Sequence, residues 1–278
     1  MFDITHPGVL DAVRRALAED IGSGDITTEL TVPALRKASG AFYSREPMVV
    51  AGTELLPVIY ELLGSVESIE LLRHSGEGAE PGDCLARVRG SARMLLTAER
   101  TALNFMQRLS GVATLAHQFS AAVAGTKCRI LDTRKTTPGL RVLEKMAAAA
   151  GGISNHRQGL FDAILIKNNH ITAAGGVLAA LAAVAGQTVP VEIEVRTLGE
   201  LDEALECGAR RLLLDNLTPE QASQWIAKIA GRASIELSGG ITLETARAYA
   251  EAGADFVSAG AITHSARALD INFRLALD

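Results

Sequence analysis

Six short apolar segments in the second half of the sequence each end in a reactive or a small residue. These end residues are Asp132, Lys167, Glu194, Asp215, Ser238 and Gly260. An acid, a base or a backbone amide can act on a substrate when the fold brings several of them to one cavity. We therefore ask what chemistry this set could perform.

Cations gather near the first two of these segments. They are Arg134, Lys135, Arg157 and Lys167, with the imidazole of His156 beside them. Four like charges in one pocket repel each other strongly in a low dielectric. The repulsion is offset if a ligand with several carboxylates or phosphates fills the site, and arginine binds such groups bidentately. The pattern predicts a polyanion site. The alternative is that each cation lies on the surface or pairs with a helix acid.

Two carboxylates, Glu194 and Asp215, end neighbouring segments. In VEIEV the side chains of a strand alternate, so Glu192 and Glu194 share a face. Carboxylates among cations could hold Mg²⁺, orient sugar hydroxyls or stabilise a developing positive carbon. A buried ion pair with Lys167 or an arginine is the alternative.

Small residues follow the last two segments, as Ser238-Gly239-Gly240 and Gly260-Ala261. Glycines let backbone N–H groups approach an anion, and barrels often bind a phosphate at these two loops. His264 follows Gly260 in the same loop, so its side chain could contact a phosphate oxygen bound there. The alternative is that the glycines form ordinary tight turns. The sequence holds no G-x-S-x-G nucleophile elbow and no H-E-x-x-H zinc motif.

The apolar segments alternate with helical patterns. They span 128–132, 163–167, 191–195, 211–215, 234–237 and 255–260. Capping boxes open two of the helices, at Thr197 with Glu200 and at Thr218 with Gln221. Apolar strands alternating with helices predict a parallel sheet covered by helices, either an open doubly wound sheet or a barrel. The polar strand ends favour a barrel, because a barrel directs them into one cavity. Six strands predict an incomplete one.

The first half of the sequence lacks the regular alternation of apolar segments and helical patterns. A helix is predicted over 7–18, and residues 38–93 alternate as strands and turns around a short helix at 57–64. The segment 97–123 reads as a helix that we expect to be interrupted near Ser110-Gly111. The sequence therefore predicts an α+β unit, built on a small sheet, before the barrel.

Composition narrows the functional classes. Hydrophobic residues make up 48% and charged residues 21%, with a net charge of −5. This composition argues against a disordered chain and against a nucleic-acid-binding role. No apolar run approaches the ~18 residues of a membrane span. The N-terminal residues lack a signal-peptide core. The three cysteines, Cys84, Cys128 and Cys207, have no metal-ligand spacing and indicate buried thiols in a reducing cytoplasm.

The sequence resembles the quinolinate phosphoribosyltransferases. The motifs that carry the resemblance are EDIGSGDITT, EPGDCLARVRGSARMLL, AERTALNFMQRLSGVAT, ILDTRKTTPGLRVLEK, NHRQGLFDAILIKNNHI, VEIEV, LLLDN, ELSGGIT and AGAITHSARALDINF. The resemblance implies that quinolinate reacts with phosphoribosyl pyrophosphate to give nicotinate mononucleotide, pyrophosphate and CO₂, with Mg²⁺ as cofactor. It also implies an α/β sandwich domain at 1–110 that 268–278 rejoin, an incomplete TIM-like α/β barrel at 111–267, and a homodimer or higher homo-oligomer.

The resemblance also assigns residues. Substrate binding is assigned to Arg100, Arg134, Lys135, His156, Arg157, Lys167, Ser238, Gly239, Gly240, Gly260 and His264. Glu194, Asp215 and Lys135 are assigned to catalysis, and Glu194 and Asp215 also to Mg²⁺, directly or indirectly. In the family, Arg100 reaches into the neighbouring subunit's site. The chain departs from the family pattern at Leu237, Arg196 and Ile153-Ser154, and we expect none of these to touch a functional residue.

A consistent mechanism has pyrophosphate leave with Mg²⁺ help, so that Glu194 and Asp215 stabilise an oxocarbenium-like carbon that the pyridine nitrogen attacks. Three alternatives remain open. One is a phosphoribosyltransferase-like protein associated with molybdenum uptake, which is similar over the barrel. Another is a lyase that forms a Schiff base on Lys167. The third is a module that only binds a phosphate metabolite. The full set of cations favours a dicarboxylate substrate.

Overall fold

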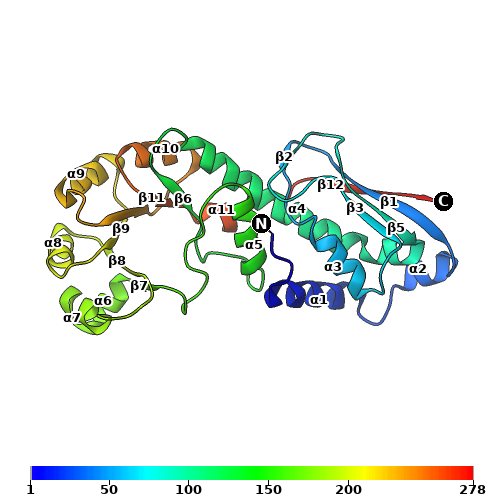
Figure 1. Cartoon of the computed structure of the whole chain (residues 1–278), viewed down its shortest axis with the longest axis horizontal. Helices are drawn as coiled ribbons and strands as arrows, with labels where there is room; N and C mark the ends of the chain where they lie inside the picture. The colour runs from blue at the N-terminus through cyan, green and yellow to red at the C-terminus, as the bar shows by residue number, and fades with distance from the viewer. Residues whose placement is uncertain (1, 278) are drawn as a thin grey trace. The chain divides into compact units, whose positions relative to one another are not determined.

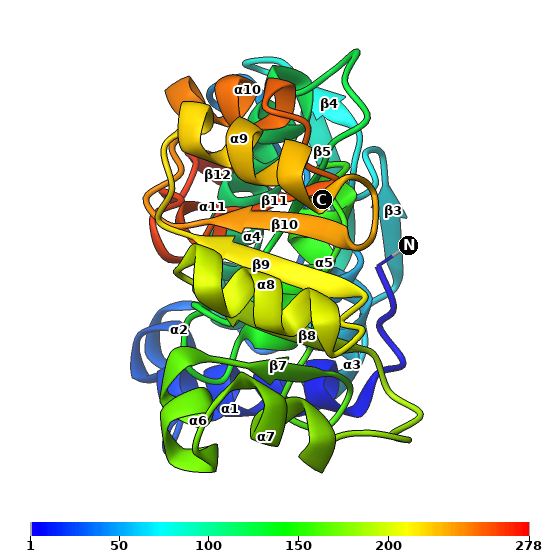
Figure 2. The same cartoon turned by 90° about the vertical axis from the view of Figure 1, so that its left-hand side faces the viewer.

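The computed structural model of the chain describes residues 2–277, and its helices and strands are shown from two sides in Figures 1 and 2. The chain forms two compact units. The N-terminal unit consists of the described residues of Met1–His117, Thr136–Gly152 and Ser265–Asp278, and the barrel unit consists of Gln118–Lys135 and Ile153–His264. The domain boundaries expected at 110/111 and 267/268 remain a prediction, and their outer limits, residues 1 and 278, lie outside the described residues.

The N-terminal unit is built on a four-stranded antiparallel sheet in the order β12-β1-β5-β3, with a small β2-β4 pair. In β1 every second residue is buried, so one face of this sheet packs on the core. The pairing of β12 with β1 brings Phe273 against Phe42. The elements of this unit are α1 (Pro7–Ile21), α2 (Ile26–Thr31), β1 (Lys37–Ser44), β2 (Met48–Val49), α3 (Leu55–Leu62), β3 (Ser68–Leu71), β4 (Gly78–Ala79), β5 (Cys84–Ser91), most of α4 (Ala92–Ala122), α5 (Arg141–Ala150) and β12 (Ile271–Leu277).

The helix α4 runs without a break through Ser110 and Gly111, so the expected interruption is wrong. Both residues serve packing instead. The Ser110 hydroxyl accepts a hydrogen bond from the Ala51 amide at 3.0 Å. A Cβ added at Gly111 would lie only 1.9 Å from the carbonyl oxygen of Arg267. The glycine is therefore needed because a neighbouring backbone segment passes against the helix.

We expect Gly111→Ala to lower the free energy of unfolding by about 1–3 kcal/mol, because the added methyl group overlaps the Arg267 carbonyl. Gly199→Ala in the barrel unit is the matched control, since its Cβ would have nothing closer than 3.9 Å. Helix propensity should make that control neutral or stabilising by up to about 1 kcal/mol. Urea unfolding of both variants measures the difference, and equal stability would contradict the packing argument.

An ion pair fixes the segment that leaves the barrel unit at Thr136 and returns at Gly152. Glu144 is fully buried and accepts hydrogen bonds from the Arg108 guanidinium, from Nε at 3.0 Å and from Nη2 at 2.8 Å. The Thr137 amide donates to the same carboxylate at 3.0 Å. A buried charge is tolerated only when paired and hydrogen-bonded in this way. The contacts explain why α5 belongs to the N-terminal unit.

The barrel unit contains one six-stranded parallel sheet in the order β6-β11-β10-β9-β8-β7. Of these strands, the one that comes first in the chain, β6, pairs with the one that comes last, β11, as in a barrel. The sheet does not close, because β6 and β7 lie at its two edges and do not pair with each other. The predicted α/β fold and its six strands are confirmed, and the barrel is incomplete. Its elements are β6 (Arg129–Leu131), β7 (Ile164–Ile166), α6 (Asn168–Ala174), α7 (Val177–Ala183), β8 (Val191–Val195), α8 (Leu198–Glu206), β9 (Arg211–Asp215), α9 (Pro219–Ile229), β10 (Ser234–Ser238), α10 (Leu243–Glu251), β11 (Phe256–Ser258) and α11 (Ala261–His264).

The capping signals of the sequence open the helices of this unit. The hydroxyls of Thr197 and Thr218 accept the amides of Glu200 and Gln221 at the starts of α8 and α9. Each cap begins its helix a few residues after a strand has ended, which keeps the loops at the carboxyl ends of the strands short. No helix within residues 2–277 has the length and apolar composition needed to cross a bilayer.

Candidate active site

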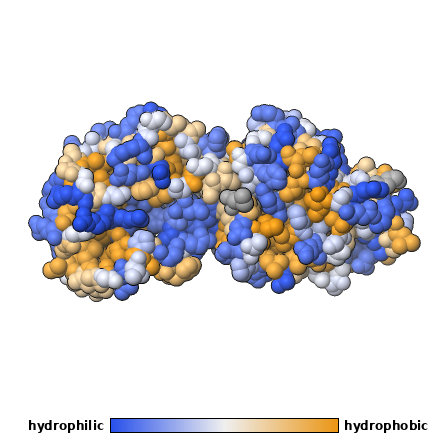
Figure 3. Space-filling model, in the orientation of Figure 1, coloured by the Kyte–Doolittle hydropathy of each residue, from blue (hydrophilic) through white to orange (hydrophobic). Residues whose placement is uncertain are grey.

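A cavity of about 840 Å³ opens at the carboxyl ends of the strands of the barrel unit. Five of the six strand-end residues line it, and Figure 3 shows hydrophilic residues across the middle of this unit's visible face, between apolar areas. The predicted site residues around the cavity are Arg134, Lys135, His156, Arg157, Lys167, Glu194, Asp215, Ser238, Gly239, Gly240, Gly260 and His264. Residues from seven segments of the chain therefore meet in one hollow, as a barrel requires.

Asp132 is the exception among the strand ends. It is fully buried and does not line the cavity. Its Oδ1 accepts the backbone amide of His156 at 2.8 Å. The expectation that every strand-end residue points into one cavity is wrong at Asp132. Because it holds the loop that carries His156 and Arg157, it acts as a positioning residue.

The four cations Arg134, Lys135, Arg157 and Lys167 all reach the cavity. Burial, and next the like charge of Arg134, lower the pKa of the Arg157 guanidinium. The lowered pKa means that the charged guanidinium is destabilised in this environment, and an anionic ligand beside it would offset that destabilisation. The Arg157 Nη1 donates to the carbonyl of Ala163 at 3.1 Å, which holds the side chain in place before any ligand binds.

Glu194 is the last residue but one of β8, and Asp215 ends the adjacent strand β9; their side chains are 6% and 15% exposed. Asp215 is held by Ser238, whose Oγ donates to Oδ1 at 2.8 Å, and by Asn216, whose Nδ2 donates to Oδ2 at 2.6 Å. This network fixes the Asp215 carboxylate, and both acids line the cavity. Such hard oxygen donors suit Mg²⁺.

Arg196 joins these two acids. Its Nη2 lies 2.6 Å from Oε1 of Glu194 and 3.7 Å from Oδ2 of Asp215. The expectation that the departures from the family pattern touch no functional residue is therefore wrong at this position. The alternative that Glu194 pairs with an arginine is the one that the structure shows. Because a single cation already spans both carboxylates, the pair also fits a divalent ion.

Glycine is required at two points of the cavity wall. Gly239 has a φ of 99°, and an added Cβ would lie 2.3 Å from Oδ1 of Asn216. A Cβ at Gly260 would lie 2.8 Å from Cδ of Lys135 and 3.1 Å from the His264 ring. Only glycine leaves the backbone accessible in such crowded positions. These loops can thus present N–H groups to a phosphate.

Comparison with known proteins agrees with this geometry. Residues 25–110 match the family model of the quinolinate phosphoribosyl transferase N-terminal domain, and residues 112–274 match that of the C-terminal domain. The chain is 44% identical to the nicotinate-nucleotide pyrophosphorylase [carboxylating] of Mycobacterium leprae, over 98% of this chain and 99% of that protein. The chain belongs to the quinolinate phosphoribosyltransferase family.

Solved structures in the quinolinate phosphoribosyltransferase family share the fold over nearly all of the chain. The nicotinate-nucleotide pyrophosphorylase of Francisella tularensis superposes with a TM-score of 0.92 at 36% identity, covering 97% of each chain. NadC from Streptococcus pyogenes superposes with a TM-score of 0.94 at 37% identity, covering 100% of this chain and 99% of that one. These likenesses support the α/β fold with its incomplete barrel.

Arg100 stands apart from the other predicted site residues of this quinolinate phosphoribosyltransferase family member. It is exposed on α4, within the N-terminal unit, and does not line the cavity described above. That placement leaves its expected role in a neighbouring subunit's site as a prediction. The roles assigned to the twelve lining residues also remain predictions, although the structure brings them together.

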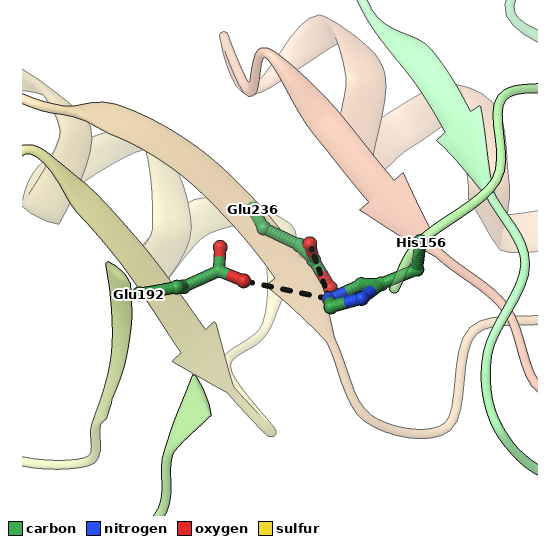
Figure 4. A group of neighbouring side chains, drawn as sticks. All are labelled: His156, Glu192 and Glu236. Carbon is green, nitrogen blue, oxygen red and sulfur yellow. Dashed lines mark ion pairs between the residues drawn. The ribbon is translucent and has the colours of Figure 1, made fainter. Parts of the chain in front are cut away.

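A buried cluster of His156, Glu192 and Glu236 lies beside the cavity and was only partly anticipated (Figure 4). The Nε2 atom of His156 lies 3.4 Å from a carboxylate oxygen of each glutamate. Glu192 does point to the same side as Glu194, but it serves this cluster and does not line the cavity. Glu236 was missed. Its signal was an acid inside the otherwise apolar strand SIELS, 3% exposed.

Hydrogen bonding distinguishes a metal site from a proton-sharing network in this cluster. The Arg157 amide lies 2.6 Å from Nδ1 of His156, and Nε2 faces the two glutamates, so a proton on Nε2 is directed at their carboxylates. A metal ion at Nε2 would have to displace that proton. We therefore interpret the cluster as a shared-proton network that orients the His156 ring.

The pKa values of His156 and Glu192 are raised. Burial by itself lowers the pKa of His156, but the hydrogen bonds and charges of Glu192 and Glu236 outweigh it and raise the pKa to about 9. Burial also raises the pKa of Glu192. Because His156 and Glu192 lie against each other, both shifts favour keeping a proton between these two groups at neutral pH.

This retained proton predicts a pH dependence of stability. The folded pKa of about 9 exceeds the ordinary histidine value of 6.5, so the stabilisation is complete below pH 6.5 and is lost as the pH rises through 9. We expect the free energy of unfolding to fall by about 3 kcal/mol across that interval. Urea unfolding from pH 6 to pH 9.5 measures it, with Glu236→Gln as the variant that should flatten the profile. A flat wild-type profile would disprove the shared proton.

Proposed function

We propose that this chain transfers the phosphoribosyl group of phosphoribosyl pyrophosphate to quinolinate, releasing pyrophosphate and CO₂ and leaving nicotinate mononucleotide. The observation that carries the proposal is the meeting of four cations with the Glu194–Asp215 pair around one cavity. Membership of the quinolinate phosphoribosyltransferase family supports the same reaction.

The cations account for binding. Quinolinate carries two carboxylates, which Arg134, Arg157 and Lys167 can neutralise from neighbouring loops. The Gly239-Gly240 and Gly260 loops offer backbone amides to the 5′-phosphate. Lys135 stands between these regions, since its Cδ lies against Gly260. Holding two anionic substrates together in this way supplies the proximity effect, worth up to about 7–11 kcal/mol.

The carboxylates account for the chemistry. The bond from the ribosyl carbon to pyrophosphate breaks, and Glu194 and Asp215 stabilise the positive charge that develops on that carbon. The pyridine nitrogen of quinolinate donates its electron pair to the carbon and becomes positively charged. The adjacent carboxylate then leaves as CO₂, and its bonding electrons pass to the ring, where a proton from solvent replaces it. No strong general base is needed.

Mg²⁺ is part of the proposal, with Glu194 and Asp215 as the residues that would hold it directly or through water. When bound, the ion would offset negative charge on the departing pyrophosphate. A homodimer or higher homo-oligomer, with Arg100 reaching the neighbouring site, is also proposed. The free thiols of Cys84, Cys128 and Cys207 support a cytoplasmic location.

A direct assay tests the proposed function. The purified protein is incubated with quinolinate labelled at the 2-carboxylate, phosphoribosyl pyrophosphate and Mg²⁺, and labelled CO₂ and nicotinate mononucleotide are followed together. We expect both in equal amounts. Nicotinate is the competing acceptor, and a preference for it would reject quinolinate as the substrate. Binding of quinolinate without CO₂ release would support the binding-module alternative, and borohydride trapping on Lys167 would support a Schiff-base lyase.

A further inference from the structure

Arg196 is a charged residue at the cavity to which the reaction above gives no role. It directly follows β8 and lines the cavity. Its guanidinium grips Glu194 with two nitrogens, Nε at 2.9 Å and Nη2 at 2.6 Å from the same oxygen. The second acid, Asp215, lies 3.7 Å from Nη2. Arg196 thus covers the two carboxylates expected to face the reacting sugar.

The two ends of Arg196 are held differently. Its backbone amide donates to Oε2 of Glu200 at 2.7 Å, within the capping box that starts α8, so the base of the side chain is fixed. The side chain is 48% exposed, and its described ion pairs are with the two cavity carboxylates. A long, half-exposed arginine of this kind can exchange one anionic partner for another without moving the backbone.

Charge balance gives this arrangement a purpose. Glu194 is nearly buried, and a buried carboxylate is costly without a cation beside it. The guanidinium supplies that cation when the cavity holds no ligand. A divalent ion approaching the same oxygens would meet a positive charge already seated on them.

We propose that Arg196 is an internal counter-cation, which competes with divalent metal for the Glu194–Asp215 pair and turns to an anionic diphosphate when that group enters the cavity. The first half of this proposal depends only on the geometry. The second half rests on the proposed function, because it assigns Arg196 to the pyrophosphate-bearing substrate. A guanidinium fork matches the oxygens of such a diphosphate.

Metal binding to the substrate-free protein tests the first half. Mn²⁺ serves as the probe, and the free ion is followed by electron paramagnetic resonance during titration. We expect Arg196→Gln to bind Mn²⁺ about tenfold more tightly than the wild type, because a competing cation has been removed from a half-exposed site. The double variant Arg196→Gln/Glu194→Gln should lose this gain. Arg196→Lys, which keeps the charge without the fork, should lie between wild type and Arg196→Gln.

Arg247→Gln is the matched control. Arg247 is 50% exposed and its Nε lies 2.6 Å from a carboxylate oxygen of Glu251, on an outer helix away from the cavity. Its replacement should leave Mn²⁺ affinity unchanged. The counter-cation role is overturned if Arg196→Gln and the wild type bind Mn²⁺ equally, or if the double variant keeps the tenfold gain.

Steady-state kinetics tests the second half. Arg196→Gln should raise KM for phosphoribosyl pyrophosphate about tenfold, leave KM for quinolinate unchanged and reach half-saturation at a lower Mg²⁺ concentration. An unchanged KM for phosphoribosyl pyrophosphate rejects the diphosphate role. If no protein turns over, the proposed function fails, while the Mn²⁺ titration still decides whether Arg196 competes for the acidic pair.

Discussion

Alanine at Glu194 or at Asp215 is expected to lower turnover about 10²–10³-fold, the size of effect seen when a preorganised electrostatic partner of a transition state is removed. KM for quinolinate should change by no more than about threefold, since these acids act on the ribosyl carbon and not on the dicarboxylate. Asp215→Ala also leaves the Ser238 hydroxyl without its 2.8 Å acceptor, so this variant should additionally loosen the phosphate loop.

The presence of Arg196 should increase the loss of turnover in Glu194→Ala. Once its main partner is removed, the guanidinium stands as an unbalanced cation beside a carbon that becomes positive. Glu194→Ala/Arg196→Gln should therefore recover part of the turnover that Glu194→Ala loses.

Asp202→Ala provides the control for these measurements, because that acid is paired with Lys228 on the outer helices. Single-turnover rates separate chemistry from binding. Normal turnover in both Glu194→Ala and Asp215→Ala would refute charge stabilisation by the pair.

The barrel strands and their helices could be predicted because each signal is local. An apolar run such as RLLLD and a capping box such as that of Thr197 with Glu200 specify their own structure. The placement of the polar strand ends could also be predicted from local sequence, because every parallel strand directs its carboxyl end to the same side. Gathering Lys167, Glu194 and Ser238 around one cavity therefore followed from the sequence.

The predictions that were wrong all concern contacts between residues that are distant in the sequence. Gly111 reads as a helix breaker until the Arg267 carbonyl is seen against it. Asp132 has the same local pattern as Asp215, yet the Asp132 carboxylate turns to the amide of His156. The side chain of Arg196 could point anywhere on the basis of its neighbours, and only the fold shows that it reaches Glu194.

The His156 cluster illustrates the same limit within the site. Its glutamates come from β8 and β10, which flank β9, and the imidazole comes from a loop before β7. Glu192 stands in an alternating pattern and could be suspected of a role. Glu236 is marked only as an acid between the apolar residues Ile235 and Leu237, and nothing local shows which side chain it contacts. Its function depends on a partner 80 residues away, and no periodicity encodes that distance.

The second large effect concerns sharing of sites between subunits. Arg100→Ala and Lys135→Ala should each abolish most activity when assayed alone, because each removes one cation from every site. A mixed dimer would combine the wild-type Lys135 of one chain with the wild-type Arg100 of the other in one of its two sites. Random mixing should therefore restore about a quarter of wild-type activity, from the closed symmetry of a dimer.

Two chains with different affinity tags, expressed together and purified over both tags, isolate the mixed dimer, in which half of the sites should be intact. Mixing Arg134→Ala with Lys135→Ala is the matched control, because both residues line the same cavity of one chain and no intact site can form. Recovery in the first pair alone would show that Arg100 acts across the interface. If the purified Arg100→Ala and Lys135→Ala mixed dimer stayed inactive, each site would have to draw both cations from its own chain, and the shared-site proposal would be abandoned.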